Sequence, residues 1–159
     1  MKIRVLTVGK IKEKYLKDAI SEYSKRLSRY CSLEIVEVAD EKTPDGASAA
    51  IEEQIKDTEG KRLLNQIRDQ EYVIALAIDG KQPDSVQFSK KVEEFGIHGI
   101  STIDFVIGGS LGLSPALLSR AQERISFSNM TFPHQLMRVI LLEQIYRAYR
   151  IMHHEPYHK

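Results

Sequence analysis

The chain has 159 residues, of which 42% are hydrophobic and 28% charged, and its formal net charge is +1. This composition predicts one ordinary globular domain over residues 1–159 that needs no disulfide or metal to fold. The near-neutral charge excludes the globally basic composition of many DNA-binding domains, although it leaves RNA open. The single Cys31 cannot form an intrachain disulfide, and no apolar run approaches the ~18 residues of a membrane span, so we expect a cytoplasmic protein with no membrane contact.

The first part of the chain predicts two strands joined by a helix. Residues 3–8 are β-rich, and residues 33–38 carry acidic positions that an edge strand tolerates. Between them, residues 13–30 repeat apolar positions at the spacing of one helical face. Nine Lys and Arg against three Asp and Glu in the first thirty positions indicate a local basic surface. Residues 40–48 form a loop.

Strand and helix patterns continue to alternate along the rest of the chain. We expect an exposed helix over residues 48–68 with Gly60 as a weak point, a buried strand over 72–78, a helix over 85–95, a buried strand over 102–107 and a helix over 115–123 capped by Ser114. This alternation predicts an α/β fold with a mainly parallel sheet.

The last predicted helix, residues 133–152, is apolar almost all the way round. A helix that packs only on its own sheet needs a single apolar stripe. We therefore expect a second subunit to cover the additional face, in a two-fold homodimer.

Residues 125–138 are the strongest candidate for a functional segment. Ser126, Ser128, Asn129 and Thr131 alternate with Phe127, Met130 and Phe132, and Pro133 then starts the last helix. Such a loop presents backbone polar groups beside apolar walls, which suits a flat heterocycle. The alternative is a tight strand-to-helix connection with buried aromatic side chains.

A glycine-rich turn at residues 108–112 follows a central strand, where open α/β sheets place their ligand crevice. The turn matches neither the dinucleotide fingerprint nor the nucleotide triphosphate loop. Gly108 and Gly109 lack Cβ atoms and could let a ligand approach the backbone, although a purely structural turn fits equally well.

The C-terminal tail contains His153, His154 and His158, but no other Cys or His lies at a matching metal-ligand spacing. We therefore expect no metal. The tail is either a disordered end or a segment whose Tyr157 and histidines contact an RNA base. No Ser-His-Asp or Cys-His arrangement indicates nucleophilic catalysis.

Four blocks in the same order resemble the RlmH family of SPOUT-class methyltransferases: FVIGGSLGL at residues 105–113, FSNMTFPHQLMR at 127–138, EQIYRA at 143–148 and PYH at 156–158. The resemblance covers essentially the whole chain. It implies methylation of N3 of a pseudouridine in helix 69 of 23S rRNA, with S-adenosylmethionine as methyl donor. It also implies a homodimer whose residues from about 72 to 159 form a trefoil knot, an exception to the rule that chains avoid threading.

The resemblance also assigns residues. The cofactor-binding residues that it implies are Leu76, Gly108, Phe127, Ser128, Asn129, Met130, Thr131 and Phe132. Leu111 departs from relatives that often carry a polar residue, which puts a side-chain role there in doubt. A protonated N3 is a poor nucleophile, so some group must take its proton. Our hypothesis is that His134 or the tail residues Tyr157 and His158 handle this proton, and that Arg138 positions a phosphate or the base.

Two other functions remain open at this stage. The chain could be a dimeric RNA-binding or ribosome-associated protein without methyl transfer, or a SPOUT methyltransferase that acts on tRNA. We expect 23S rRNA in the assembled ribosome as the partner, because a near-neutral protein favours a site completed by two subunits and a structured RNA surface.

Overall fold

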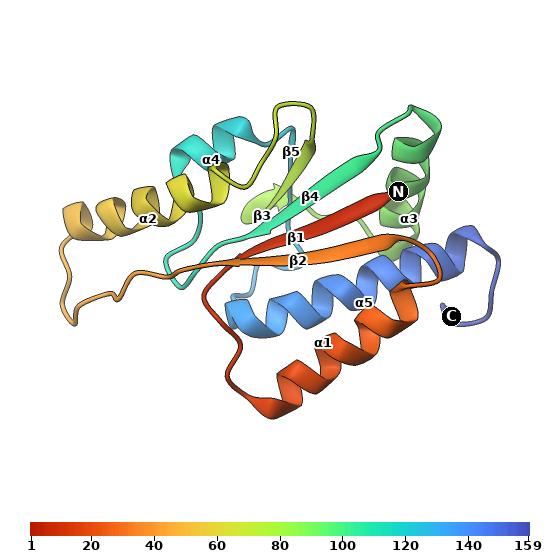
Figure 1. Ribbon diagram of the computed structural model, residues 1–159, viewed down its shortest axis with the longest axis horizontal. Helices are drawn as coiled ribbons and strands as arrows, with labels where there is room; N and C mark the ends of the chain where they lie inside the picture. The colour runs from red at the N-terminus through yellow and green to blue at the C-terminus, as the bar shows by residue number, and fades with distance from the viewer.

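Five parallel strands form one sheet in the computed structural model, which describes residues 1–159 (Figure 1). The strands are β1 (Lys2–Val8), β2 (Ser32–Val38), β3 (Tyr72–Lys81), β4 (Thr102–Ile107) and β5 (Glu123–Ile125). Their order across the sheet is β2-β1-β4-β3-β5, and every neighbouring pair is parallel. The predicted α/β class with a parallel sheet is confirmed, and β2 lies at an edge as its acidic residues suggested.

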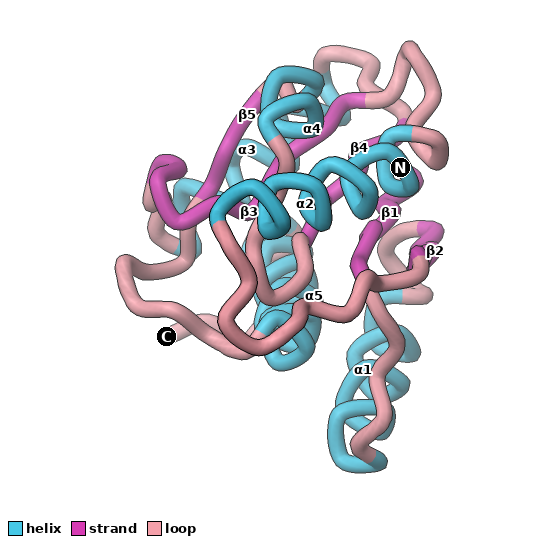
Figure 2. Tube along the Cα trace, turned by 90° about the vertical axis from the view of Figure 1, so that its left-hand side faces the viewer, coloured by secondary structure: helices cyan, strands magenta, loops and turns pink.

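Helices cover both faces of this sheet. They are α1 (Lys14–Leu27), α2 (Ala49–Leu64), α3 (Ser85–Ile97), α4 (Pro115–Arg120) and α5 (His134–Met152). On one face α5 packs against both α1 and α3, while α2 and α4 pack together on the other (Figure 1). The view in Figure 2 shows α1 projecting beyond the rest of the molecule. No helix is long and apolar enough to cross a membrane.

Alternate residues of the central strands build two separate cores. Ile3, Val5 and Phe105 face the layer of α1, α3 and α5, where they pack with Leu142 and Ile145. The larger core therefore depends on α5. Their neighbours along the strands, Leu6, Val8 and Val106, face α2 and α4 and pack with Leu63 and Leu117. Burial on both faces explains why these strands read as nearly continuous apolar runs.

Because all strands are parallel, their carboxyl ends meet at one edge of the sheet. The connections that follow β1, β4 and β5 leave from this edge, and α5 begins there before running back along the sheet (Figure 1). The topology thus gathers several loops at one place, which is a precondition for a site.

The end of α4 differs from the prediction. The helix expected over residues 115–123 ends at Arg120, and Glu123–Ile125 forms β5 instead. Ser114 caps α4 as predicted, since its Oγ accepts from the N–H of Leu117 at 3.2 Å. Beyond the helix, the N–H of Val73 donates to Gln122 Oε1 at 2.7 Å, and Glu123 accepts from Tyr72 Oη. These bonds to β3 stabilise an extended conformation that local propensity does not reveal.

Gly60 is a packing contact and not the weak point that was expected. It is buried in α2 opposite Ser114, and a Cβ built on it would lie 2.2 Å from Ser114 Oγ. The missing side chain lets α2 approach the start of α4 closely. Leu63 of α2 and Leu117 of α4 pack in the same core beside this contact.

The packing of α5 explains part of its unusual apolar character. Leu141, Leu142, Ile145 and Ala148 are fully buried, because α1 and α3 flank this helix on two sides. Some of the apolar surface that the sequence analysis attributed to a partner is therefore covered within the chain. Leu136, Val139 and Ile140 stay partly exposed, so homodimer formation remains a prediction.

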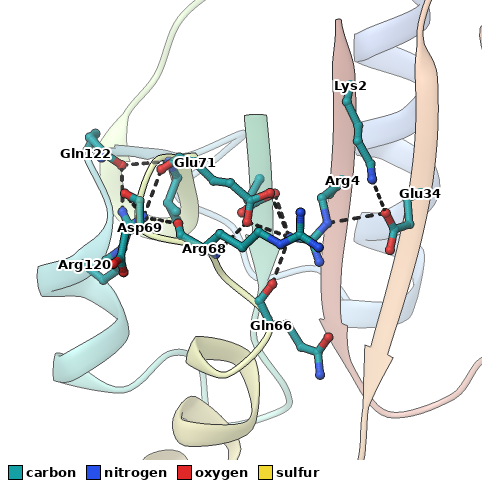
Figure 3. A network of polar contacts seen from close by, with 11 residues as sticks. Lys2, Arg4, Glu34, Gln66, Arg68, Asp69, Glu71, Arg120 and Gln122 are labelled. Carbon is teal, nitrogen blue, oxygen red and sulfur yellow. Dashed lines mark hydrogen bonds and ion pairs between the residues drawn. The ribbon is translucent and has the colours of Figure 1, made fainter. Parts of the chain in front are cut away.

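Arg4 is the centre of a buried polar network between the sheet and α2 and α4 (Figure 3). Its Nη1 donates to Glu71 Oε1 at 3.1 Å, to Asp104 Oδ1 at 3.2 Å and to the carbonyl oxygen of Gln66 at 2.9 Å. The two carboxylates are 67 and 100 residues away in the sequence, which is why no local pattern indicated the cluster. It lies near the amino ends of the strands, at the edge opposite the loops described above.

Candidate active site

One cavity of about 750 Å³ lies at the carboxyl edge of the sheet. Three segments line it: residues 76–79 of β3, residues 107–113 at and after the end of β4, and residues 125–134 from the end of β5 to the start of α5. Within the third segment, Asn129 does not line the cavity. Met137 and Leu118 complete the wall. Its size falls within the range of roughly 300–1,000 Å³ that is usual for small-molecule and cofactor sites. The three loops that the sequence analysis singled out therefore border one cavity.

Short side-chain bonds shape the loop after β5. Ser126 Oγ donates to the carbonyl oxygen of Ser128 at 2.8 Å, and Ser128 Oγ accepts from the N–H of Met130 at 2.9 Å. Such bonds hold an irregular backbone without a strand partner. These hydrogen bonds stabilise the loop where it lines the cavity. The side chain of Phe127 packs against the larger core.

Five of the six cofactor-binding residues predicted in this loop line the cavity: Phe127, Ser128, Met130, Thr131 and Phe132. Asn129 does not, because it bonds across to the segment after β3, where its Oδ1 accepts from Gln82 Nε2 at 2.8 Å. Leu76 and Gly108 also line the cavity. Cofactor binding by these residues stays a prediction.

The glycine turn has a structural reason for its composition. A Cβ on Gly108 would lie 2.7 Å from the carbonyl carbon of Gly112, so a side chain there would collide with the turn itself. Gly112 has a φ of +89°, which favours glycine. Gly109 is close to Val8 of the neighbouring strand, since its Cβ would lie 3.3 Å from Val8 Cγ1. The tight turn thus exposes the backbone and the Leu111 side chain to the cavity.

Leu76 was predicted to bind the cofactor, but the bulge that follows it in β3 was not predicted. The pairing of β3 with β5 jumps from Leu76 to Lys81, so the residues between them bulge out of the ladder. Ile78 and Asp79 in this bulge line the cavity. Gly80 permits the bulge, because a Cβ on it would lie 2.6 Å from the carbonyl carbon of Ile125. The Asp79-Gly80 pair after an apolar run was the available signal.

His134 is the first residue of α5 and lines the cavity, half-buried. Burial lowers the pKa of its imidazole below the usual value, and the nearby Arg138 guanidinium lowers the pKa further, against a weaker opposing effect of Asp40. A neutral imidazole at neutral pH can accept a proton or a hydrogen bond. His134 therefore stays a candidate general base at the cavity wall, and its catalytic role stays a prediction.

Arg138 follows one turn later on α5 but is buried, with 2% of its surface exposed. Its Nη1 is 2.6 Å from Glu37 Oε2, and its Nη2 donates to the carbonyl oxygens of Val8 and Gly9 at 3.0 and 2.8 Å. It does not line the cavity. In this chain the guanidinium joins α5 to the ends of β1 and β2, and its expected contact with a phosphate or base stays a prediction.

The tail residues lie at the other end of α5. Tyr157 Oη donates to Glu143 Oε1 at 3.0 Å, and burial, together with this carboxylate, raises the pKa of Tyr157 to about 12. His158 Nδ1 is 3.2 Å from Arg147 Nη1. Because α5 has 19 residues, its two ends are separated by roughly 28 Å. The structure brings His134 and the three loops together, but not the tail of the same chain.

Comparison with known proteins decides the family. A family model described as "Predicted SPOUT methyltransferase" matches residues 1–158. The chain belongs to this SPOUT methyltransferase family. Full-length relatives include "Ribosomal RNA large subunit methyltransferase H" of Bifidobacterium adolescentis, 66% identical, and a protein of Clostridium perfringens strain SM101 named "Ribosomal RNA large subunit methyltransferase H 1", 61% identical. Each alignment covers 100% of both chains.

A solved structure shares this fold at much lower sequence similarity. The probable methylase family protein from Haemophilus influenzae Rd KW20 aligns with a TM-score of 0.55 at 13% identity. The alignment covers 99% of this chain and 70% of that one. The α/β architecture described above is therefore shared by the two proteins.

Membership of the SPOUT methyltransferase family supports S-adenosylmethionine as the cofactor, as the sequence predicted. The residues that line the cavity fit this molecule. Leu76, Ile107 and Phe127 provide apolar walls for a flat base, and the irregular backbone at residues 108–113 and 126–132 provides polar groups beside them. No group of three or more His, Cys, Asp or Glu residues could hold a metal ion.

Proposed function

We propose that this SPOUT methyltransferase uses S-adenosylmethionine to methylate N3 of a pseudouridine in helix 69 of 23S rRNA, within the large ribosomal subunit. The observation that carries the proposal is the cavity where three strand ends converge, with His134 at its wall. The names of the full-length relatives, 66% and 61% identical, support ribosomal RNA of the large subunit as substrate. The precise nucleotide follows from the family resemblance of the sequence blocks.

When bound, the cofactor would supply the methyl group of its sulfonium, and the rest of the cofactor would leave as a neutral thioether. The N3–H bond of the base must break as the new bond from N3 to carbon forms. In this proposal the imidazole of His134 accepts the N3 proton, because it is neutral and half-buried at the cavity wall. Phe127 and Phe132 exclude water, and the backbone of the loop after β5 orients the cofactor for an in-line reaction.

The active form in this proposal is a homodimer in which the tail acts on the partner's cavity. Leu136, Val139 and Ile140 form a partly exposed apolar strip on α5 that a second copy can cover. If two α5 helices pair antiparallel about a two-fold axis, the end of one helix comes to the start of the other. Tyr157 and His158 then reach the partner's site, although they are remote from His134 in their own chain. The trefoil knot in residues 72–159 is part of the same proposal.

Mass spectrometry of RNA after incubation with the purified protein and S-adenosylmethionine tests the activity. The substrates are large ribosomal subunits, protein-free 23S rRNA and bulk tRNA in separate reactions. We expect one added methyl group, in a helix 69 fragment that contains pseudouridine, from the subunits. Methylation of tRNA alone would overturn the proposed substrate.

Calorimetry with S-adenosylmethionine separates an enzyme from an RNA-binding protein without methyl transfer. We expect one binding site per chain. Absence of binding, together with association with ribosomes, would support the second function and contradict methyl transfer.

A further inference from the structure

The loop from β1 to α1 and the first two residues of α1, residues 9–15, carry three exposed side chains for which no ion pair or hydrogen bond is formed within the chain: Lys10, Lys12 and Tyr15. Lys10 and Lys12 are exposed, and neither forms an ion pair with a carboxylate. Tyr15 leaves 70% of its surface exposed, which is unusual for a large aromatic side chain. Gly9 and Ile11 are the buried residues of this segment, Ile11 with 8% exposed, and they anchor a segment whose other side chains are exposed.

A buried contact fixes this loop to the start of α5. Arg138 donates to the carbonyl oxygens of Val8 and Gly9, and it pairs with Glu37 Oε2 at 2.6 Å. The same Glu37 oxygen accepts from the N–H of Ile11 at 3.4 Å. The guanidinium is nearly inaccessible to solvent, so these contacts are not exchanged for water. Arg138 and Glu37 thus determine where the loop leaves the sheet.

The loop also lies beside the candidate active site. Val8, at its start, is next to Gly109 of the turn that lines the cavity. Gln135, which follows His134, points its Nε2 to the carbonyl oxygen of Lys10 at 3.4 Å. Figure 1 shows the connection leaving β1 and passing the beginning of α5 on its way to α1. A substrate that enters the cavity therefore passes close to this loop.

We infer that residues 9–15 form an RNA-contacting element at the entrance of the cavity, with Arg138 and Glu37 as its positioning residues. Lys10 and Lys12 contact backbone phosphates of the substrate RNA, and Tyr15 stacks on an unpaired base. Unpaired lysines beside an exposed aromatic ring are the groups that bind single-stranded or looped RNA. The inference rests on the proposed function, because it requires an RNA substrate, and it adds which surface of the chain holds that RNA.

The double variant Lys10→Glu/Lys12→Glu tests the phosphate contacts. We expect the KM for large ribosomal subunits to rise at least tenfold, while the Kd for S-adenosylmethionine changes less than twofold. The slope of log KM against log salt should decrease by roughly one to two, because each lost phosphate contact removes about 0.7–0.9. The matched control is Lys61→Glu/Lys90→Glu, which makes the same charge change at exposed lysines of α2 and α3.

Glu37→Gln tests the positioning role. It removes the charge that pairs with Arg138 and leaves every exposed group of the loop in place. We expect KM for the subunits to rise with kcat unchanged, and we expect no additional rise when Glu37→Gln is combined with the Lys10→Glu/Lys12→Glu change. A purely structural effect would instead be additive.

Co-sedimentation with large subunits, measured alongside methyl transfer, separates failure of this inference from failure of the proposed function. If the wild type transfers methyl groups and the lysine variant has wild-type KM, salt slope and co-sedimentation, the loop inference is overturned alone. If the wild type transfers no methyl groups, but the lysine variant alone loses co-sedimentation with the subunits, the inference that residues 9–15 contact RNA is supported while the proposed function fails. A wild type that neither transfers methyl groups nor binds subunits overturns both.

Discussion

Arg4 and Asp104 face each other across β1 and β4, with Arg4 Nη1 at 3.2 Å from Asp104 Oδ1 in a region closed to solvent. The other oxygen, Asp104 Oδ2, has no hydrogen-bond partner. Burial raises the pKa of the Asp104 carboxyl to about 6, despite the attraction of Arg4, and nearby Glu71 contributes to the rise. A half-satisfied carboxylate in the interior is costly even beside an arginine.

This raised pKa predicts how stability depends on pH. An aspartate carboxyl in water has a pKa of 3.8, whereas the pKa of Asp104 in the fold is about 6, so the folded state binds this proton more tightly. The contribution of Asp104 favours folding below pH ~4 and is lost as the pH rises to ~6. The measured quantity is the difference in the free energy of unfolding between the wild type and Asp104→Asn. We expect this difference, wild type minus variant, to fall by roughly 1–3 kcal/mol between pH ~4 and pH ~6. Urea unfolding at several pH values measures it, and a pH-independent difference would contradict the assignment.

The contact between Gly60 and Ser114 predicts a position that tolerates no side chain. Gly60→Ala places a Cβ within 2.2 Å of Ser114 Oγ, the atom that caps α4. Overpacking of this kind costs about 1–3 kcal/mol, which exceeds the gain in helix propensity. Gly96→Ala is the control, because Gly96 lies in α3 with nothing within 4 Å of its Cβ position. Thermal unfolding should show a lower Tm for the first variant and an unchanged or higher Tm for the second.

His134 predicts a loss of rate without a loss of cofactor binding. We expect His134→Ala to reduce kcat by about 10²–10⁴, the usual contribution of a general base, with the Kd for S-adenosylmethionine nearly unchanged. Because burial lowers the pKa of His134 below 6.5, the base form predominates at pH 7 and is lost at more acidic pH. The wild-type rate should therefore fall with acidification only at pH values below the 6.5 of an ordinary imidazole. A wild-type rate for His134→Ala would remove the residue from the mechanism, and His98→Ala, at an exposed position, provides the control.

The distance along α5 predicts complementation between two defective subunits. His134→Ala and Tyr157→Phe alter opposite ends of the helix and should each impair methyl transfer as homodimers. If the tail acts on the partner's cavity, a mixed dimer contains one intact site. Random mixing should therefore restore about a quarter of the wild-type sites in a two-fold dimer. A mixture with only the summed residual activities would contradict action between subunits, as would full activity of Tyr157→Phe alone.

Patterns of neighbouring residues predicted most of the helices and strands. Apolar runs and helical spacing located β1, β4 and α5, and Ser114 with Pro115 marked the start of α4, because these signals depend on residues close together in the chain. The family resemblance then assigned Leu76, Gly108 and residues 127–132 to one cofactor site, and parallel strands place the first two at the same edge of the sheet. Residues close together in the chain were sufficient for the elements, whereas the site also needed the resemblance.

Several residues have roles that depend on contacts with distant parts of the chain, and these contacts exist only in the folded protein. Arg138 carries no local sign of burial, yet Glu37 and the carbonyls of Val8 and Gly9 occupy its guanidinium. In the sequence Gly60 predicts a weak point in a helix, whereas in the structure it packs against Ser114. Packing of α5 between α1 and α3 covers surface that the pattern alone attributed to a partner. In each case the deciding contact joins residues far apart in sequence, and its energy leaves no trace in the spacing of nearby side chains.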